Sequence, residues 1–258
     1  MGWIRIEELR KPNIRDITLV QGLPGLGLVG KLAVDYIIEE LRPERFAILY
    51  SNDLMLPDGK AGVLVDIKGL CELPRYEFYS YKGPKGDIVF LTGNTQPVSW
   101  AQYEVAEKVL NYLKEEYGLK LVIAVCGTVA RGRSGEVYVS ANDEELLREV
   151  ASKYSLKVSS EGAVTGACGI VPGLAKLHGI KGLILMGGVG QIYPDPVATR
   201  SVLRVLNALL GLNVSLARMD LIVEDMVKKS MAIERLRRSM ATREGGEREE
   251  RGPPWYYV

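Results

Sequence analysis

The chain has 258 residues, of which 47% are hydrophobic and 25% charged, and its formal net charge at pH 7 is +1. This length and composition are typical of one globular domain with, at most, a small appendage. The near-neutral charge argues against general binding to nucleic acids or membrane surfaces, and no apolar run reaches the roughly 18 residues that cross a bilayer.

Predicted strands and helices alternate along the first 215 residues, as hydrophobic periods of two and of 3.6 residues indicate. In chain order they cover 17–20 (strand), 28–41 (helix), 45–50 (strand), 61–67 with 71–81 (a hairpin), 87–91 (strand), 99–117 (helix), 119–125 (strand), 136–140 (strand), 142–154 (helix), 171–177 (helix), 182–186 (strand) and 197–210 (helix). Gly118 is predicted to end the second helix, and Asn142 to cap the third. Repeated strand–helix units predict a three-layer α/β sandwich with a mainly parallel sheet.

The C-terminal part of the chain has a different pattern. Apolar residues spaced by three, four or seven positions predict one helix over 216–243, whose apolar face packs either on the parent sheet or against another subunit. The residues that follow are charged and rich in glycine and proline, a composition that buries too little surface to order itself. We therefore expect an α/β core domain at 1–215, a C-terminal helix at 216–243 and a flexible tail at 244–258.

The predicted tail ends in four large side chains, Trp255, Tyr256, Tyr257 and Val258. Large apolar residues at the end of a polar tether are typical of a docking peptide, because tyrosine supplies contact area and one hydroxyl at low entropic cost. A terminal carboxylate on Val258 would pair with a lysine of the partner. The alternative is that these residues fold back onto the chain's own core.

Three groups of residues resemble those of a known family. The segment 22–30, GLPGLGLVG, resembles the opening motif of the proteasome-assembly-chaperone family, and Gly187-Gly188 with Tyr193-Pro194-Asp195-Pro196 resembles its later landmarks. The order of Tyr256, Tyr257 and Val258 resembles the C-terminal hydrophobic-tyrosine-X signature of proteasome regulatory particles and assembly chaperones.

This resemblance implies an α/β fold similar to nucleoside phosphorylases, self-association, and docking of the tail into pockets of the 20S proteasome α-ring. It predicts an assembly chaperone or an ATP-independent activator, which is not an enzyme and needs no cofactor. We expect a soluble homo-oligomer that binds neither nucleic acid nor membrane. We expect it in the cytoplasm, because the N-terminal residues lack the apolar core of a signal peptide.

An enzymatic alternative comes from the spacing Gly25-x-Gly27-x-x-Gly30. This loop follows a predicted strand and opens a helix, and Asp53 lies beyond the next strand, which is the outline of a dinucleotide-binding fingerprint. A nucleotide- or nucleoside-binding α/β enzyme is therefore the second hypothesis. We prefer the interpretation that these glycines permit positive φ and close packing of helix on sheet.

The remaining reactive residues are few and scattered. Cys71, Cys126 and Cys168 show neither zinc nor redox spacing, so we expect unpaired thiols in a reducing compartment, with Cys126 in the core and Cys168 in a loop. The one histidine, His178, is predicted to lie at a helix end. We assign no catalytic residue and no metal site, and an oligomeric scaffold whose tail binds another partner is a third hypothesis.

Overall fold

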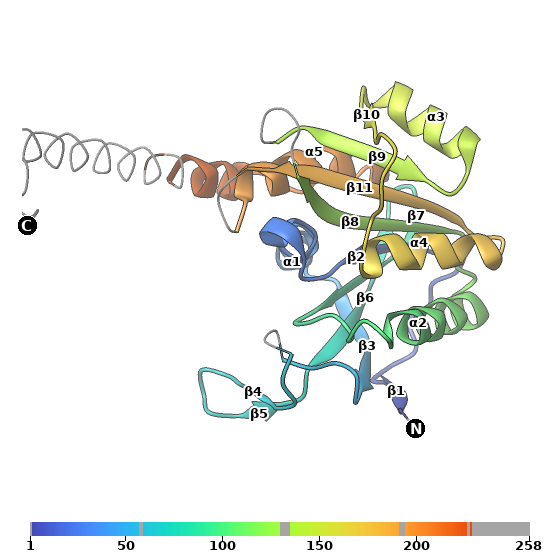
Figure 1. The fold of residues 1–258 in the computed structure, drawn as a ribbon, viewed down its shortest axis with the longest axis vertical. Helices are drawn as coiled ribbons and strands as arrows, with labels where there is room; N and C mark the ends of the chain where they lie inside the picture. Colours follow the sequence, from blue (N-terminus) through green and yellow to red (C-terminus); the bar gives the residue numbers. More distant parts are fainter. Residues whose placement is uncertain (1, 57–58, 130–134, 191–193, 226–227, 229–258) are drawn as a thin grey trace, which may run out of the picture. The chain divides into compact units, whose positions relative to one another are not determined.

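A computed structural model describes residues 2–56, 59–129, 135–190, 194–225 and 228 (Figure 1). The chain divides into two compact units, Met1–Leu216 and Ala217–Val258, and each is described by itself. In the second unit, residues 217–225 are helical. The remainder of the predicted helix at 216–243, apart from residue 228, and the whole predicted tail with Trp255, Tyr256, Tyr257 and Val258 lie outside the described residues.

Among the described residues, nine strands of the first unit form one sheet, in the order β1-β3-β6-β7-β2-β8-β11-β9-β10. Their bounds are β1 (Ile4–Glu8), β2 (Thr18–Gly22), β3 (Glu44–Ser51), β6 (Arg75–Gly83), β7 (Gly86–Gly93), β8 (Leu121–Val129), β9 (Val137–Ala141), β10 (Lys157–Val158) and β11 (Lys181–Val189). At the centre, β2 is parallel to both β7 and β8, and β11 is parallel to β8. Antiparallel pairs flank this centre: β1–β3, β3–β6 and β6–β7 on one side and β9–β11 on the other.

Helices cover both faces of the sheet, which confirms the predicted three-layer α/β sandwich (Figure 1). They are α1 (Val29–Leu41), α2 (Gln102–Tyr117), α3 (Glu144–Lys153), α4 (Ala167–Leu177) and α5 (Pro196–Leu210), with a short 3-10 turn η1 (Leu26–Leu28) before α1. Helices α2 and α4 pack together on one face, where Leu19 of β2 shares a buried cluster with Val109 and Val171. Helices α1 and α5 pack together against β2, β8 and β11.

Two helix ends test the caps that the sequence predicted, one correctly and one wrongly. Gly118 ends α2 in the left-handed conformation at φ 65°, as predicted, because glycine carries no Cβ to oppose that φ. The predicted cap at Asn142 is wrong, since Asp143 caps α3 by accepting a hydrogen bond from the Leu146 N–H (2.8 Å). The Asn142 amide instead bonds three backbone groups where α4 meets β11: Pro172 O, Ile180 O and Gly182 N–H.

The predicted hairpin over 61–81 is only partly correct. Strands β4 (Leu64–Val65) and β5 (Cys71–Glu72) form a separate two-stranded ribbon that projects from the sheet (Figure 1). The Asp66 carboxylate closes its turn by accepting hydrogen bonds from the N–H groups of Lys68 and Leu70. The ribbon ends before Pro74, which has no N–H for a ladder, and β6 then joins the main sheet between β3 and β7.

Candidate functional site

The glycine-rich loop between β2 and α1 is packed tightly against the sheet. Gly27 adopts φ 62°, in the left-handed region. A Cβ on Gly30 would overlap the carbonyl oxygen of Val125 in β8, and a Cβ on Gly22 would overlap the carbonyl oxygen of Gly30. Glycine is therefore required at Gly22 and Gly30 so that the first turn of α1 can approach the backbone of two strands.

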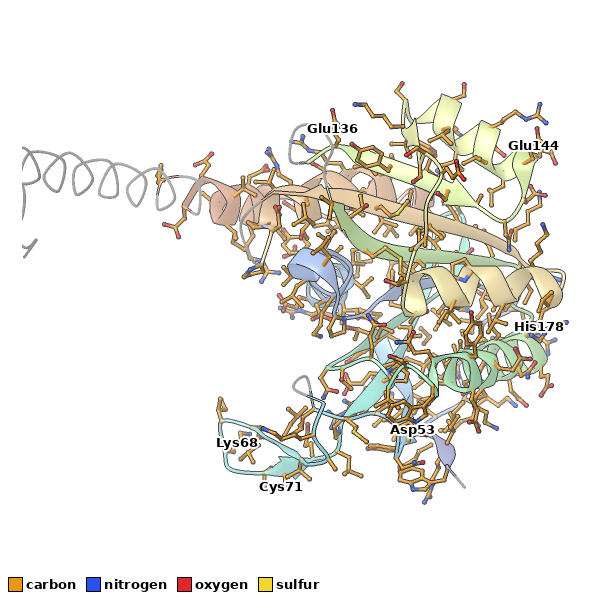
Figure 2. The ribbon with its side chains drawn as sticks, in the orientation of Figure 1. Asp53, Lys68, Cys71, Glu136, Glu144 and His178 are labelled. Atoms are coloured by element: carbon orange, nitrogen blue, oxygen red, sulfur yellow. A yellow bond between two sulfur atoms is a disulfide. The ribbon has the colours of Figure 1, made fainter. Side chains whose placement is uncertain are left out.

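The two halves of the dinucleotide fingerprint do not meet in this fold. Asp53 follows β3, whereas the glycine loop follows β2, and β6 and β7 lie between these two strands (Figure 2). With strands about 4.8 Å apart, the ends of β2 and β3 are separated by about 14 Å. In a dinucleotide site the acidic residue instead stands beside the glycine loop, on the neighbouring strand.

Two of the motifs that carried the family resemblance do meet. The Asp195 N–H donates to the carbonyl oxygen of Gly27 (2.9 Å). The Asp195 carboxylate accepts hydrogen bonds from the N–H of Ala198, where it caps α5, and from the N–H of Gly190 after β11. This side chain is buried, so it acts as an internal connector between the first glycine loop, β11 and α5. Tyr193 of the same motif lies outside the described residues.

A cleft of about 890 Å³ opens beside the glycine loop, at the carboxyl ends of β2, β8 and β11. Its walls come from the glycine loop, the segment before α2, the end of β8 and the segment that leads into α4. Gln96 fastens two of these walls together, because its Nε2 donates to the Pro24 carbonyl oxygen and its Oε1 accepts from the Ala167 N–H (3.1 Å). Gly25 lines this cleft, whereas Gly27 and Gly30 are not among its lining residues.

A disulfide joins Cys126 of β8 to Cys168 of α4, with Cα atoms 6.3 Å apart, in the wall of this cleft. The prediction of unpaired cysteines is therefore wrong for these two, and Cys168 lies in a helix rather than a loop. Their 42-residue separation gives no local signal. Cys71, on the projecting ribbon, keeps a free, exposed thiol (Figure 2).

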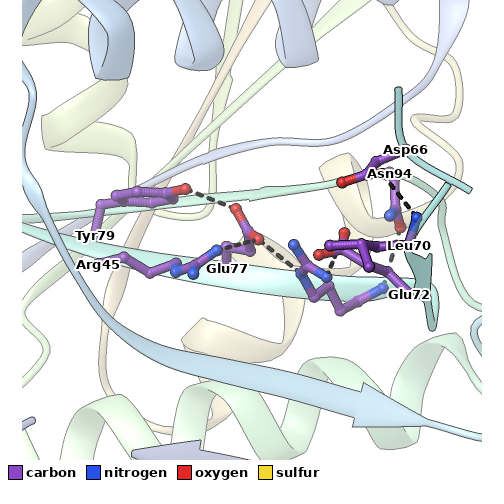
Figure 3. A network of polar contacts seen from close by, with 8 residues as sticks. Arg45, Asp66, Leu70, Glu72, Glu77, Tyr79 and Asn94 are labelled. Carbon is purple, nitrogen blue, oxygen red and sulfur yellow. Dashed lines mark hydrogen bonds and ion pairs between the residues drawn. The ribbon is translucent and has the colours of Figure 1, made fainter. Parts of the chain in front are cut away.

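A second polar cluster lies on β3 and β6, around the carboxylate of Glu77 (Figure 3). Its Oε1 accepts from Arg45 Nη1 and from Arg75 Nε, both at 2.7 Å, and its Oε2 accepts from the Tyr79 hydroxyl at 2.6 Å. Burial acts to raise the pKa of Glu77, but the hydrogen bonds from Tyr79 and Arg75 and the arginine charges outweigh it and hold that pKa below its usual range. Because each of these groups is paired, the cluster holds β3 and β6 together.

The other candidate residues also have structural partners. His178 ends α4, as predicted, and its Nε2 lies 2.9 Å from Glu107 Oε1 of α2. The described residues hold no group of three or more His, Cys, Asp or Glu side chains arranged to bind a metal ion. Within the same part of the chain, every helix is too short or too polar to cross a bilayer.

Comparison with known sequences identifies the family. The family model described as the PAC2 family matches residues 19–236, so the chain belongs to this family. This membership confirms the resemblance to proteasome assembly chaperones inferred from the glycine-rich motif. A relative from Methanocaldococcus jannaschii, the uncharacterized protein MJ1210, is 32% identical over 211 residues, which are 80% of this chain and 79% of that protein.

Two solved structures from Pyrococcus furiosus share this fold. PbaB, described as an archaeal proteasome activator, is 32% identical with a TM-score of 0.81, over 90% of this chain and 98% of PbaB. PbaA, described as an archaeal homolog of proteasome-assembly chaperone, is 26% identical with a TM-score of 0.70, over 95% of each chain.

Proposed function

We propose that this chain is a proteasome-binding assembly chaperone or ATP-independent activator that acts by binding and not by catalysis. The observation that carries the proposal is the similarity to PbaB, an archaeal proteasome activator, over 98% of that protein. The similarity to PbaA, a homolog of proteasome-assembly chaperones, supports the same class of function. A protein with this function works in the cytoplasm, beside the proteasome.

The proposed contact is made by the C-terminal residues. Tyr256 supplies the hydrophobic group, Tyr257 the ring and hydroxyl, and Val258 the carboxylate that pairs with a lysine between two α-ring subunits of the 20S particle. One such tail binds weakly. A homo-oligomer presents several tails at once, and the second and later contacts then gain from effective concentration.

The test compares the full chain with a variant that lacks Tyr256, Tyr257 and Val258. We expect the full chain to co-migrate with purified 20S particles and to change their peptide hydrolysis, and the truncated chain to do neither. Tyr257→Ala should act like the truncation. Tyr257→Phe, which keeps the ring, should retain part of the binding and so serves as the matched control.

Three further results would contradict parts of the proposal. Equal binding by the full and truncated chains would show that another surface contacts the proteasome, and no binding by either would remove the proteasome function. Light scattering after size-exclusion chromatography tests the predicted homo-oligomer, and a monomer would contradict the multivalent contact.

A further inference from the structure

The two edges of the nine-stranded sheet differ in how much backbone they expose. At one end of the strand order stands β10, which has only two residues. Such a short edge strand offers little to another chain. At the other end stands β1 (Figure 1), which pairs along its whole length with β3 on its inner side. Among the described residues no strand pairs with its outer side, so β1 presents an open edge.

The backbone of β1 shows which groups lie on that open edge. Residues of an antiparallel strand direct their N–H and C=O groups alternately to the two sides. The Leu9 N–H, just after the strand, donates to the carbonyl oxygen of Phe46 in β3 (2.8 Å). Counting back from Leu9 in steps of two, the odd-numbered residues of β1 also face β3. The residues that direct their N–H and C=O groups outward are therefore Ile4, Ile6 and Glu8.

Grooves flank β1 on both faces of the sheet. On one face, Trp3, Arg5 and Glu7 line a groove of about 770 Å³. On the other face, Ile4 and Ile6 line a groove of about 620 Å³. These two isoleucines pack on the main core cluster but remain partly exposed. A strand laid along this edge would cover them and satisfy the outward backbone groups.

The charges of β1 favour a second copy of the same strand as the occupant of this edge. Arg5 and Glu7 stand on either side of Ile6 and line the same groove, and neither forms an ion pair with another described residue. When two copies of β1 lie antiparallel about a two-fold axis at Ile6, Arg5 stands directly opposite the partner's Glu7, and Glu7 opposite the partner's Arg5. Opposite charges in that position stabilise a strand pair, whereas like charges destabilise it.

The backbone selects the same register. With the axis at Ile6, the hydrogen-bonded pairs are Ile6 with the partner's Ile6 and Ile4 with the partner's Glu8, which are the residues that direct their N–H and C=O groups outward. Arg5 and the partner's Glu7 then form a non-hydrogen-bonded pair, with Cα atoms about 4.5 Å apart. An axis at Arg5 or at Glu7 would instead set two like charges against each other.

We propose that β1 is a contact surface between two copies of this chain, which join their sheets through an antiparallel β1–β1 pair about a two-fold axis at Ile6. The same register sets Trp3 opposite the partner's Leu9, and both side chains are large, apolar and exposed in the single chain. A surface that pairs with itself in this way forms a closed two-fold contact. This inference rests on the homo-oligomer of the proposed function and names the surface that forms it.

The experiment reverses the two charges one at a time in the full chain. Arg5→Glu sets two acidic groups against each other in both cross-strand pairs, and Glu7→Arg sets two basic groups against each other. Each variant alone should dissociate at concentrations about tenfold or more above those of the parent protein. An equimolar mixture of the two variants should associate like the parent, because each pair is then again of opposite charge. Sedimentation equilibrium measures these dissociation constants.

Two further variants serve as controls. The double variant Arg5→Glu, Glu7→Arg restores opposite charges within one protein, so it should associate like the parent. Glu144→Arg makes the same change of net charge as Glu7→Arg at an exposed side chain of α3, which packs on β9 and β10 at the other edge (Figure 2). It should leave association unchanged. Circular dichroism checks that every variant is folded.

The outcomes separate this contact from the proposed function. Single variants that associate like the parent, or a mixture that does not regain association, overturn the β1 contact alone. The first of these results is also expected if another segment of this chain covers the edge. A monomeric parent overturns the β1 contact together with the predicted homo-oligomer. A parent that associates with itself but not with purified 20S particles removes the proteasome function and leaves the β1 contact standing.

Discussion

The two halves of the sheet are held together in different ways. Around β2, β8 and β11, backbones approach so closely that glycine is required at Gly22 and Gly30, and a disulfide joins β8 to α4. Around β3, β6 and β7, Arg45, Arg75 and Tyr79 converge on the carboxylate of Glu77 (Figure 3). The first half depends on shape and the second on charge.

This difference predicts how each half responds to substitution and to pH. In the second half, the carboxylates of Glu77 and Glu72 together balance the charges of Arg45 and Arg75. In the first half, close packing and a covalent bond hold the framework, and the buried carboxylate of Asp195 accepts hydrogen bonds from backbone N–H groups. The comparison predicts that the close packing and the disulfide of the first half give a stability that does not change with pH, whereas the ion pairs of Glu77 in the second half give one that does.

The largest effect is expected at Gly30. In Gly30→Ala the new Cβ would overlap the Val125 carbonyl oxygen, and neither backbone can withdraw without displacing a helix or a strand. We expect a loss of about 4 kcal/mol or more in the free energy of unfolding, or failure to fold. Urea unfolding followed by circular dichroism measures this loss.

Gly25 provides the matched control in the same loop. It has an extended backbone with φ −169°, and the nearest atom to a Cβ on it is Gln96 Nε2 at 3.8 Å. Gly25→Ala should change stability by less than about 0.5 kcal/mol. Equal losses for the two substitutions would show that the loop needs glycine for flexibility and not for close packing.

The next largest effect is expected from the disulfide. The bond closes a loop over a sequence separation of 42 residues, for which chain entropy predicts about 3–4 kcal/mol of stabilisation. The double variant Cys126→Ala, Cys168→Ala should lose about that amount. Dithiothreitol should lower the stability of the parent protein similarly, and it should leave the variant unchanged.

The control for the disulfide is Cys71→Ala, which removes the exposed thiol and should alter neither stability nor the response to reductant. Mass spectrometry without reduction should find Cys126 and Cys168 in one cross-linked peptide. Detection of three free thiols in the unreduced native protein would contradict the bond.

Local signals in the sequence were sufficient for most of the fold. Apolar runs identified the central strands, and Gly118 marked the end of α2, because both depend on residues close in the chain. Strand β1 was missed, since its burial is only partial and charged residues alternate with Ile4 and Ile6. Its pairing with β3 depends on a partner about 40 residues away.

The residues that line the cleft could not be predicted from the sequence, because they are brought together by contacts that no local pattern reveals. Cys126 and Cys168 meet only after α4 has packed beside β8, and Gln96 reaches both Pro24 and Ala167. One signal was available: Gln21 is a polar residue that follows an apolar strand run and precedes a required glycine. A polar side chain in such a place calls for a partner from a distant segment, and Gln21 Oε1 has none among the described residues.

The smallest of the three effects, and the only one that should depend on pH, is expected at Glu77. Its folded-state pKa is lowered, so its contribution to stability is complete above the unfolded pKa of about 4.3 and is lost as the pH falls through the folded value. Glu77→Gln should therefore cost about 2 kcal/mol at neutral pH, and the difference from the parent protein should shrink steadily as the pH falls below about 4. Urea unfolding of both proteins across this range measures the difference, and Glu144→Gln, at an exposed side chain, should show almost none. A constant difference at all pH values would mean that Glu77 acts through its shape, and that the two halves of the sheet do not differ in the way proposed here.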